Sequence, residues 1–248
     1  MRLSRPIGRK LARLEMAAVK DFDKIYRERG AYHVTAQGFD AWFLDENYAK
    51  IAAFCKPGDA VLDLGCGEGR LSDYLPDAKV IHGVDYLESA IALNRATYGA
   101  RYGNLFRAHL KDLATLGIAG RSYDRIISSL TLMYLTRGEL DECLQAAFNL
   151  LRDDGMFVAT YPNLMSLRAA SAESFELPAD ELRSTFEEAN FRVVALEPVC
   201  PYLPKQVVQD SYVSESRQTA RECYLQAASR MDMTNSYHFL IAAEKCAA

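Results

Sequence analysis

The feature that most constrains the fold is a glycine cluster at the end of a short apolar run. Residues Ala60–Leu64 are apolar except for Asp63, and Gly65, Gly67 and Gly69 follow at every second position. A short apolar run bounded by turn residues is consistent with a buried strand. Glycines allow a turn that brings backbone N–H groups close to a ligand. The pattern therefore predicts a strand, a tight loop and a following helix, with a ligand site at the loop.

Similar apolar runs alternate with helical patterns along the chain. The expected strands are 60–64, 79–84, 104–108, 123–129, 156–161, 191–199 and 237–244. The expected helices are 39–54, 88–98, 140–151, 178–190 and 211–229. This alternation predicts an α/β fold, doubly wound around a mostly parallel seven-stranded sheet. Such sheets bind ligands at the carboxyl ends of their strands.

Composition excludes several classes of protein. With 50% hydrophobic and 25% charged residues, the chain matches ordinary globular domains. Its net charge of −4 argues against a broad basic surface, so DNA is not an expected partner. No apolar run approaches the ~20 residues of a membrane helix, and we expect no transmembrane segment.

The six cysteines carry no C-x-x-C pair, which argues against a zinc or redox site. Scattered thiols suit a reducing compartment, and we expect a cytoplasmic protein. The sequence shows no cluster of His, Cys and carboxylate residues, so no metal is expected. The first twenty residues are basic, which leaves two interpretations open: an exposed arm, or a segment that lies on an anionic partner.

An acidic residue follows the second expected strand. Asp85 comes sixteen residues after Gly69, where a carboxylate accepts hydrogen bonds from ribose hydroxyls. A nicotinamide-binding loop would have Gly or Ala at the position of Arg70. The carboxylate of Asp63 would repel a pyrophosphate and attract an ammonium group. These residues favour S-adenosylmethionine over a dinucleotide.

The segment 63–69, Asp-Leu-Gly-Cys-Gly-Glu-Gly, resembles the first motif of class I methyltransferases. The resemblance continues through Gly83–Asp85, Tyr123–Ser128 and Leu151–Phe157, and it covers Ala60 to Tyr161. It implies the class I type of sheet. Outside the resemblance, the segments before and after it are expected to add an N-terminal helical cap and an insertion before the last strand. The resemblance also implies an enzyme that transfers the methyl group of S-adenosylmethionine.

The resemblance assigns roles around the cofactor. The backbone of Gly65, Cys66 and Gly67 would wrap the methionine and ribose, and Asp63 would help to hold the ammonium. Asp85 would bridge the ribose hydroxyls. The other expected cofactor contacts are Tyr86 on the adenine, Leu110 and Asp112 after the third strand, and Leu130 after the fourth. The acid that the family often carries after the third strand is replaced here by His109-Leu110-Lys111.

The acceptor is less constrained. Residues 128–134 lack the Asn/Asp-Pro-Pro-Tyr/Phe motif of amino-directed enzymes, which disfavours nucleobase N-methylation. His33 and His109 are candidate general bases, whereas His82 and His238 lie inside expected strands and are interpreted as core residues. The candidate acceptor contacts are Tyr26, Tyr32, Tyr134, Tyr202 and Tyr212.

The chain is expected to divide into four parts. These are an N-terminal arm and helical cap (1–56), a cofactor-binding core (57–200), an insertion (201–235) and the final strand with the C-terminus (236–248). The insertion exceeds what a hairpin requires, and it is interpreted as a lid over a small-molecule acceptor or as a homodimer contact or surface helix. Two other functions stay open: methylation of a protein or structured RNA, and a catalytically silent binding module.

Overall fold

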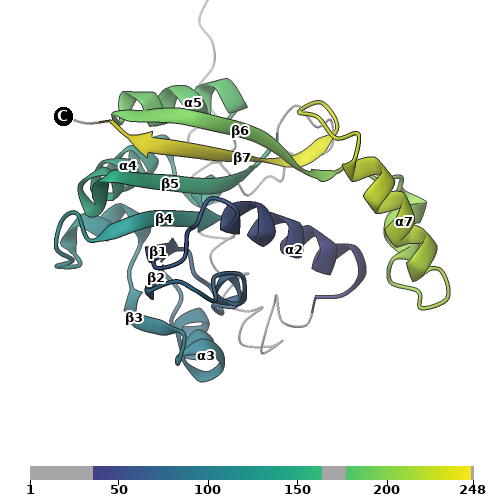
Figure 1. The fold of residues 1–248 in the computed structure, drawn as a ribbon, viewed down its shortest axis with the longest axis horizontal. Helices are drawn as coiled ribbons and strands as arrows, with labels where there is room; N and C mark the ends of the chain where they lie inside the picture. The colour runs from purple at the N-terminus through teal and green to yellow at the C-terminus, as the bar shows by residue number, and fades with distance from the viewer. Residues whose placement is uncertain (1–35, 164–176, 247–248) are drawn as a thin grey trace, which may run out of the picture.

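The computed structural model describes residues 36–163 and 177–246, which form a seven-stranded sheet with helices on both faces (Figure 1). The strand order is β3-β2-β1-β4-β5-β7-β6. The strands are β1 (Ala60–Leu64), β2 (Val80–Asp85), β3 (Tyr102–Arg107), β4 (Tyr123–Ser129), β5 (Leu151–Pro162), β6 (Phe191–Pro201) and β7 (Ser236–Lys245). Strand β7 runs antiparallel to both β5 and β6, and the other pairs are parallel. The expected doubly wound, mostly parallel seven-stranded sheet is confirmed.

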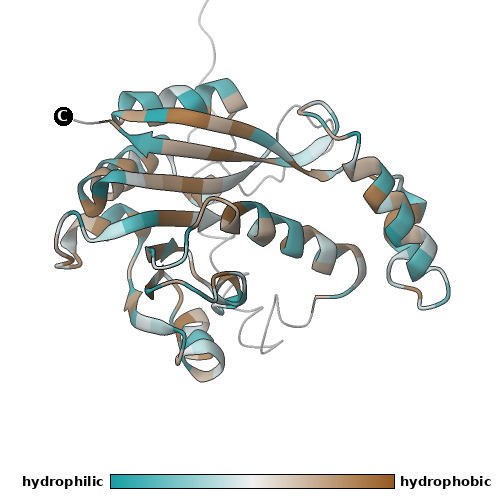
Figure 2. Ribbon diagram, viewed as in Figure 1, coloured by the Kyte–Doolittle hydropathy of each residue, from teal (hydrophilic) through white to brown (hydrophobic). Residues whose placement is uncertain are grey.

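Helices cover the sheet on two sides. The α-helices are α2 (Gly38–Ala52), α3 (Glu88–Tyr98), α4 (Arg137–Leu150), α5 (Ala179–Glu188), α6 (Lys205–Asp210) and α7 (Arg217–Ala228). The 3-10 helices are η1 (Arg70–Tyr74), η2 (Leu110–Thr115) and η3 (Leu132–Tyr134). Helices α2 and α3 bury apolar residues with η1 on one face, and α4 and α5 do so with η2 on the other. Figure 2 shows the apolar colour concentrated along β5 to β7 and the hydrophilic colour on the outer side of α5.

The carboxyl ends of β1, β2, β4 and β5 lie at one edge of the sheet. Strand β6 is antiparallel to β7, which is antiparallel to β5, so β6 also ends at this edge. The insertion with α6 and α7 therefore starts and finishes where ligands bind in such sheets. Figure 1 shows α7 at this end, beside α2.

Three local expectations were wrong in detail. The glycine loop leads into the five-residue 3-10 helix η1 instead of a full α-helix; Pro76 restricts the backbone of Leu75 and stops the turn there. Strand β5 starts at Leu151, because residues 151–155 form an irregular extension that still pairs with β4. The helix expected over 211–229 starts only at Arg217, as α7, and the short helix α6, which was not expected, precedes it.

The connection from β3 to β4 has no α-helix. Residues 108–122 contain only η2 before the chain enters β4 at Tyr123. One face of β2 and β3 is therefore covered at its amino end by a loop alone. No helix within the described ranges is long and apolar enough to cross a membrane.

Candidate active site

The glycine loop packs tightly between neighbouring segments. Gly65 and Gly69 have φ of +75° and +91°, a left-handed conformation that favours glycine. A Cβ on Gly65 would lie 2.1 Å from Oγ1 of Thr131, and one on Gly69 would lie 2.7 Å from the amide of Asn94. Only glycine fits these two positions. The loop is thus fixed against the end of β4 on one side and against α3 on the other.

Asp85 joins the end of β2 to this loop. Its Oδ2 accepts the N–H of Gly67 at 2.9 Å, and its Oδ1 accepts the N–H of Leu87 at 2.9 Å. Burial raises the pKa of Asp85, although its backbone hydrogen bonds oppose the shift. The backbone of Tyr86 also acts on this carboxylate. A carboxylate has about four acceptor positions, so part of its acceptor capacity remains for a ligand.

Asp63 lies beneath the loop. It is 2% exposed, and its Oδ2 accepts the hydroxyl of Tyr102 at 2.8 Å. Burial raises the pKa of Asp63 to about 7; the bond from Tyr102 opposes this shift and the charge of Asp85 adds to it. The sequence predicted the acid but not its depth inside the fold.

Two further residues beneath the loop were missed by the sequence analysis. Tyr102 lies at the start of β3, outside the strand expected there. The buried Asn94 lies on the inner face of α3, and its amide donates to the carbonyl of Gly67 at 3.4 Å. A polar residue on the apolar face of a helix was the available signal for Asn94.

Aromatic rings lie beside Asp85 at the ends of β2 and β3. Tyr86 is 51% exposed, and its ring meets that of His109 edge-on, with centroids 5.5 Å apart. His109 precedes η2, in which Leu110 is buried and Asp112 is exposed. The exposed face of Tyr86 can receive a flat ring.

His109 is also part of a charged group. Its Nε2 lies 3.9 Å from Oε1 of Glu139, which also accepts from Lys111 Nζ at 3.3 Å. Burial alone would raise the pKa of Glu139. The hydrogen bonds from Thr136 and Lys111 and the charge of His109 oppose burial, and the pKa lies below its usual value. The carboxylate is therefore ionised beside His109.

The end of β4 supplies a constrained turn. Leu130 is half-buried with φ of +56°, a conformation that costs of order 1–3 kcal/mol in a non-glycine residue and often occurs at ligand sites. Its N–H donates to the carbonyl of Thr160 at 3.2 Å. Thr131, which limits Gly65, follows directly. Tyr134 is half-buried in η3.

Helix α2 is fixed over η1 by Asp45. Its Oδ1 accepts from Nη2 of Arg70 at 2.9 Å and from the hydroxyl of Tyr74 at 2.5 Å. Arg70, which occupies the position of the third glycine in a dinucleotide-binding loop, thus contacts α2. The same helix contacts the insertion, because Trp42 packs on Tyr224 and the guanidinium of Arg221 lies 5.0 Å from the Trp42 ring.

The expected acceptor contacts differ in burial, and some of them lie outside the described residues. Tyr202 is half-buried, with its ring centroid 4.2 Å from that of Tyr237, and Tyr212 is 43% exposed. His238, interpreted as a core residue, packs on Phe43, and burial lowers its pKa to about 3. Tyr26, Tyr32 and His33 lie outside the described residues. Among the described residues, no group of three His, Cys, Asp or Glu is arranged to hold a metal ion.

A family model described as methyltransferase domain matches residues 55–228. No curated protein matches the chain. Many solved structures share the fold. The 1,6-didemethyltoxoflavin-N1-methyltransferase of Burkholderia thailandensis, solved with 1,6-didemethyltoxoflavin and S-adenosylhomocysteine, is 18% identical with a TM-score of 0.61, covering 100% of this chain and 94% of its own.

Two other similar structures differ in their stated activity. An S-adenosylmethionine-dependent methyltransferase from Mesorhizobium loti is 18% identical, with a TM-score of 0.58 over 81% of this chain and 98% of its own. The [4+2]-cyclase SpnF is 14% identical, with a TM-score of 0.62 over 96% of this chain and 97% of its own. At these identities the structures show a shared fold.

Proposed function

This chain belongs to the family of methyltransferase domains, and on that basis we propose that it transfers the methyl group of S-adenosylmethionine to a small molecule. When bound, this cofactor supplies an activated methyl group on a sulfonium. The protein then has to hold the cofactor, align an acceptor atom and exclude competing nucleophiles. Alignment of two reactants can lower a barrier by ~7–11 kcal/mol.

The observation that carries the proposal is the position of Asp85. Its carboxylate accepts the backbone N–H groups of Gly67 and Leu87, with a further backbone contact from Tyr86, and keeps part of its acceptor capacity. A carboxylate at this position, directly beside the glycine loop, fits the hydroxyls of a ribose. The glycine loop beside it presents backbone without side chains, which suits close contact with the rest of a nucleoside.

Other residues complete the proposed cofactor site. Tyr86 packs on the adenine, with Leu110 and Asp112 at its edge, and Leu130 borders the site from β4. When it is ionised, the Asp63 carboxylate places negative charge beneath the loop, which favours an ammonium over a pyrophosphate. Because Asp63 is buried, we assign it an electrostatic role through the loop.

We assign the acceptor side to the insertion, residues 201–235, and to the cap, residues 1–56. The insertion lies at the carboxyl edge and packs on α2. Tyr134, Tyr202 and Tyr212 are the acceptor contacts that we propose within the described chain, and Tyr26 and Tyr32 are proposed beyond it. His109, beside ionised Glu139, and His33 are the candidate general bases for an acceptor that must lose a proton.

The thiols support a cytoplasmic setting for the proposed reaction. All six cysteines are free, which fits a reducing compartment such as the cytoplasm. The net charge of −4 supports a small molecule over nucleic acid as acceptor.

Cofactor binding and transfer are tested separately. Calorimetry with S-adenosylhomocysteine should show one saturable site, with no comparable affinity for NAD. Transfer of a labelled methyl group is then measured over a metabolite library, with tRNA and lysate protein as parallel acceptors. Label in a metabolite supports the proposal, whereas label only in tRNA or protein would replace the acceptor class.

A protein of this fold that binds the cofactor without transferring its methyl group would give a different result in these assays. Fold alone does not determine reaction, and SpnF, which shares this fold, is a [4+2]-cyclase. Cofactor binding without any labelled product would favour a binding module.

A further inference from the structure

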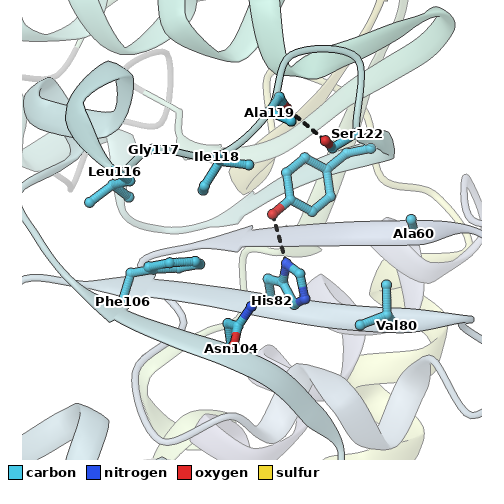
Figure 3. A pocket seen from close by; sticks show the side chains of 11 residues that line it. Ala60, Val80, His82, Asn104, Phe106, Leu116, Gly117, Ile118, Ala119 and Ser122 are labelled. Atoms are coloured by element: carbon cyan, nitrogen blue, oxygen red, sulfur yellow. Dashed lines mark hydrogen bonds between the residues drawn. The ribbon is translucent and has the colours of Figure 1, made fainter.

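A cavity of about 380 Å³ lies at the end of the sheet opposite the glycine loop (Figure 3). Its walls include Ala60 and Val80, the first residues of β1 and β2, whereas Gly65 and Asp85 lie at the far ends of these strands. Its roof is the loop 116–119 that connects η2 to β4. The cavity exists because the β3–β4 connection has no α-helix to fill this face.

Three aromatic rings shape the interior. Nδ1 of His82 lies 2.8 Å from the hydroxyl of Tyr123, and the two rings are nearly perpendicular, with centroids 5.7 Å apart. The ring of Phe106 meets the other side of His82 at 77°, with centroids 6.3 Å apart. Edge-to-face surroundings of this kind favour an aromatic guest.

The cavity carries hydrogen-bonding groups but no charge. None of its lining residues is Lys, Arg, Asp or Glu. Burial lowers the pKa of His82 below its usual 6.5, so the imidazole is neutral at pH 7. A charged guest would lose its hydration without gaining a partner.

One atom of His82 is left for a ligand. Nδ1 is occupied by Tyr123, and within the described chain Nε2 has no hydrogen-bond partner. Gly103 leaves room beside this atom, because a Cβ there would lie 2.8 Å from Nε2. A neutral imidazole can donate or accept through this nitrogen, according to its tautomer.

We propose that this cavity is a second ligand site, which takes one small uncharged aromatic molecule with a hydrogen-bonding group, such as a phenol or an indole. Its volume lies in the lower part of the ~300–1,000 Å³ found for ligand pockets, which suits one or two rings. The site is independent of methyl transfer, because it lies at the amino ends of the strands.

The test uses the full chain with indole and p-cresol as probes. Calorimetry should show saturable binding to one site, and the amide NMR signals of residues 116–123 should shift. Benzoate and benzylammonium, which match these probes in size but carry a charge, should bind at least tenfold more weakly. Binding of the charged probes with equal affinity would overturn the proposal.

Two variants locate the site. Ala119→Trp fills the mouth from an exposed position and should abolish probe binding; Ala96→Trp, on the exposed surface of α3, is the matched control and should bind as the original chain does. Tyr123→Phe keeps the ring but releases Nδ1, so the affinity for p-cresol should change at least threefold without loss of fold. Unchanged affinity in both cavity variants would overturn the proposal.

Saturating S-adenosylhomocysteine separates this site from the one proposed for methyl transfer. The probes should still bind in its presence, with the same NMR shifts in residues 116–123. Displacement of the probes would place them at the carboxyl edge and overturn the second site. Failure of S-adenosylhomocysteine to bind would instead count against the proposed function and leave the cavity result unaffected.

Discussion

Oδ2 of Asp85 accepts the backbone N–H of Gly67 at 2.9 Å, which ties the end of β2 to the loop after β1. The carboxylate holds the loop, and under the proposed function its remaining acceptor capacity also binds the ribose of the cofactor. Cofactor affinity and loop order are expected to depend on the same side chain.

Asp85→Ala should weaken S-adenosylmethionine binding by a few kcal/mol, because each hydrogen bond to a charged group contributes roughly 1.5–3 kcal/mol. Calorimetry would show this as at least a tenfold rise in Kd. The control is Asp141→Ala on the exposed side of α4, which should leave Kd unchanged. Equal affinity of the Asp85 variant and the original chain would refute the assignment.

Asp63 should make the free protein less stable as pH rises. Its pKa is raised from 3.8 to about 7 in the folded state, so between these values the folded state holds a proton that the unfolded state has lost. Stability then decreases with rising pH. Across pH 5 to 7.5, the original chain should lose on the order of 2–3 kcal/mol relative to Asp63→Asn.

Urea unfolding at the two pH values measures this difference, with Asp77→Asn at an exposed position as the control. Tyr102→Phe should steepen the loss, because it removes the bond that favours ionised Asp63. A difference between the chain and Asp63→Asn that does not vary with pH would contradict the assignment.

Gly65→Ala should destabilise the fold and impair cofactor binding, since its Cβ would collide with Thr131. Gly58→Ala is the control that separates the steric collision at Gly65 from backbone strain. Gly58 also has a left-handed φ of +87°, but no atom lies within 4 Å of a Cβ there. Strain alone is expected to cost of order 1–3 kcal/mol, so Gly58→Ala should fall in that range and Gly65→Ala above it. Thermal unfolding and calorimetry check both, and equal losses in the two variants would exclude the collision.

Replacing residues 203–234 with a short Gly-Ser turn should preserve cofactor binding and lower turnover by orders of magnitude, because the acceptor would lose its orientation. The cut keeps Tyr202, whose N–H donates to the carbonyl of Asn235 at 2.8 Å. Since the cut also exposes Trp42 of α2, Tyr212→Ala is a milder second variant. Light scattering tests the dimer alternative, which predicts a changed mass; a monomeric and fully active deletion variant would remove the lid from the mechanism.

Methyl transfer should persist in EDTA. The described residues contain no cluster that could hold a metal ion, and the proposed reaction requires only alignment and, for some acceptors, a base. The measurement is turnover before and after chelation, with magnesium added back. Activity that is lost in EDTA and restored by magnesium would establish a metal-assisted mechanism instead.

The strands were predictable because each one is a short apolar run that ends at a turn signal, as in Ala60–Leu64 before Gly65. The break between α6 and α7 was not, because it depends on a distant contact: the hydroxyl of Ser211 accepts the N–H of Phe39, 172 residues away in sequence. Pro76 did carry a local signal that the helix after the loop would be short.

The geometry of the candidate site was predictable where one residue type suffices: the glycines form the tight loop, and Asp85 lies beside it. The geometry could not be predicted where burial decides what a side chain can do. The sequence identified Asp63 as acidic, but its burial inside the fold and its hydrogen bond from Tyr102 are properties of the packing. Likewise, no pattern linked His82 to Tyr123, which pair across the strand that lies between theirs.

The insertion has a consequence for how proteins of this kind diversify. Its two ends are paired, with Pro201 opposite Ser236 across β6 and β7, so segments of different length can be exchanged between these points without shifting the register of the sheet. The glycine loop has no such freedom, because Thr131 and Asn94 enclose it. New acceptor preferences should therefore be obtained by grafting foreign segments between Pro201 and Ser236, while the sheet and the glycine loop are kept unchanged.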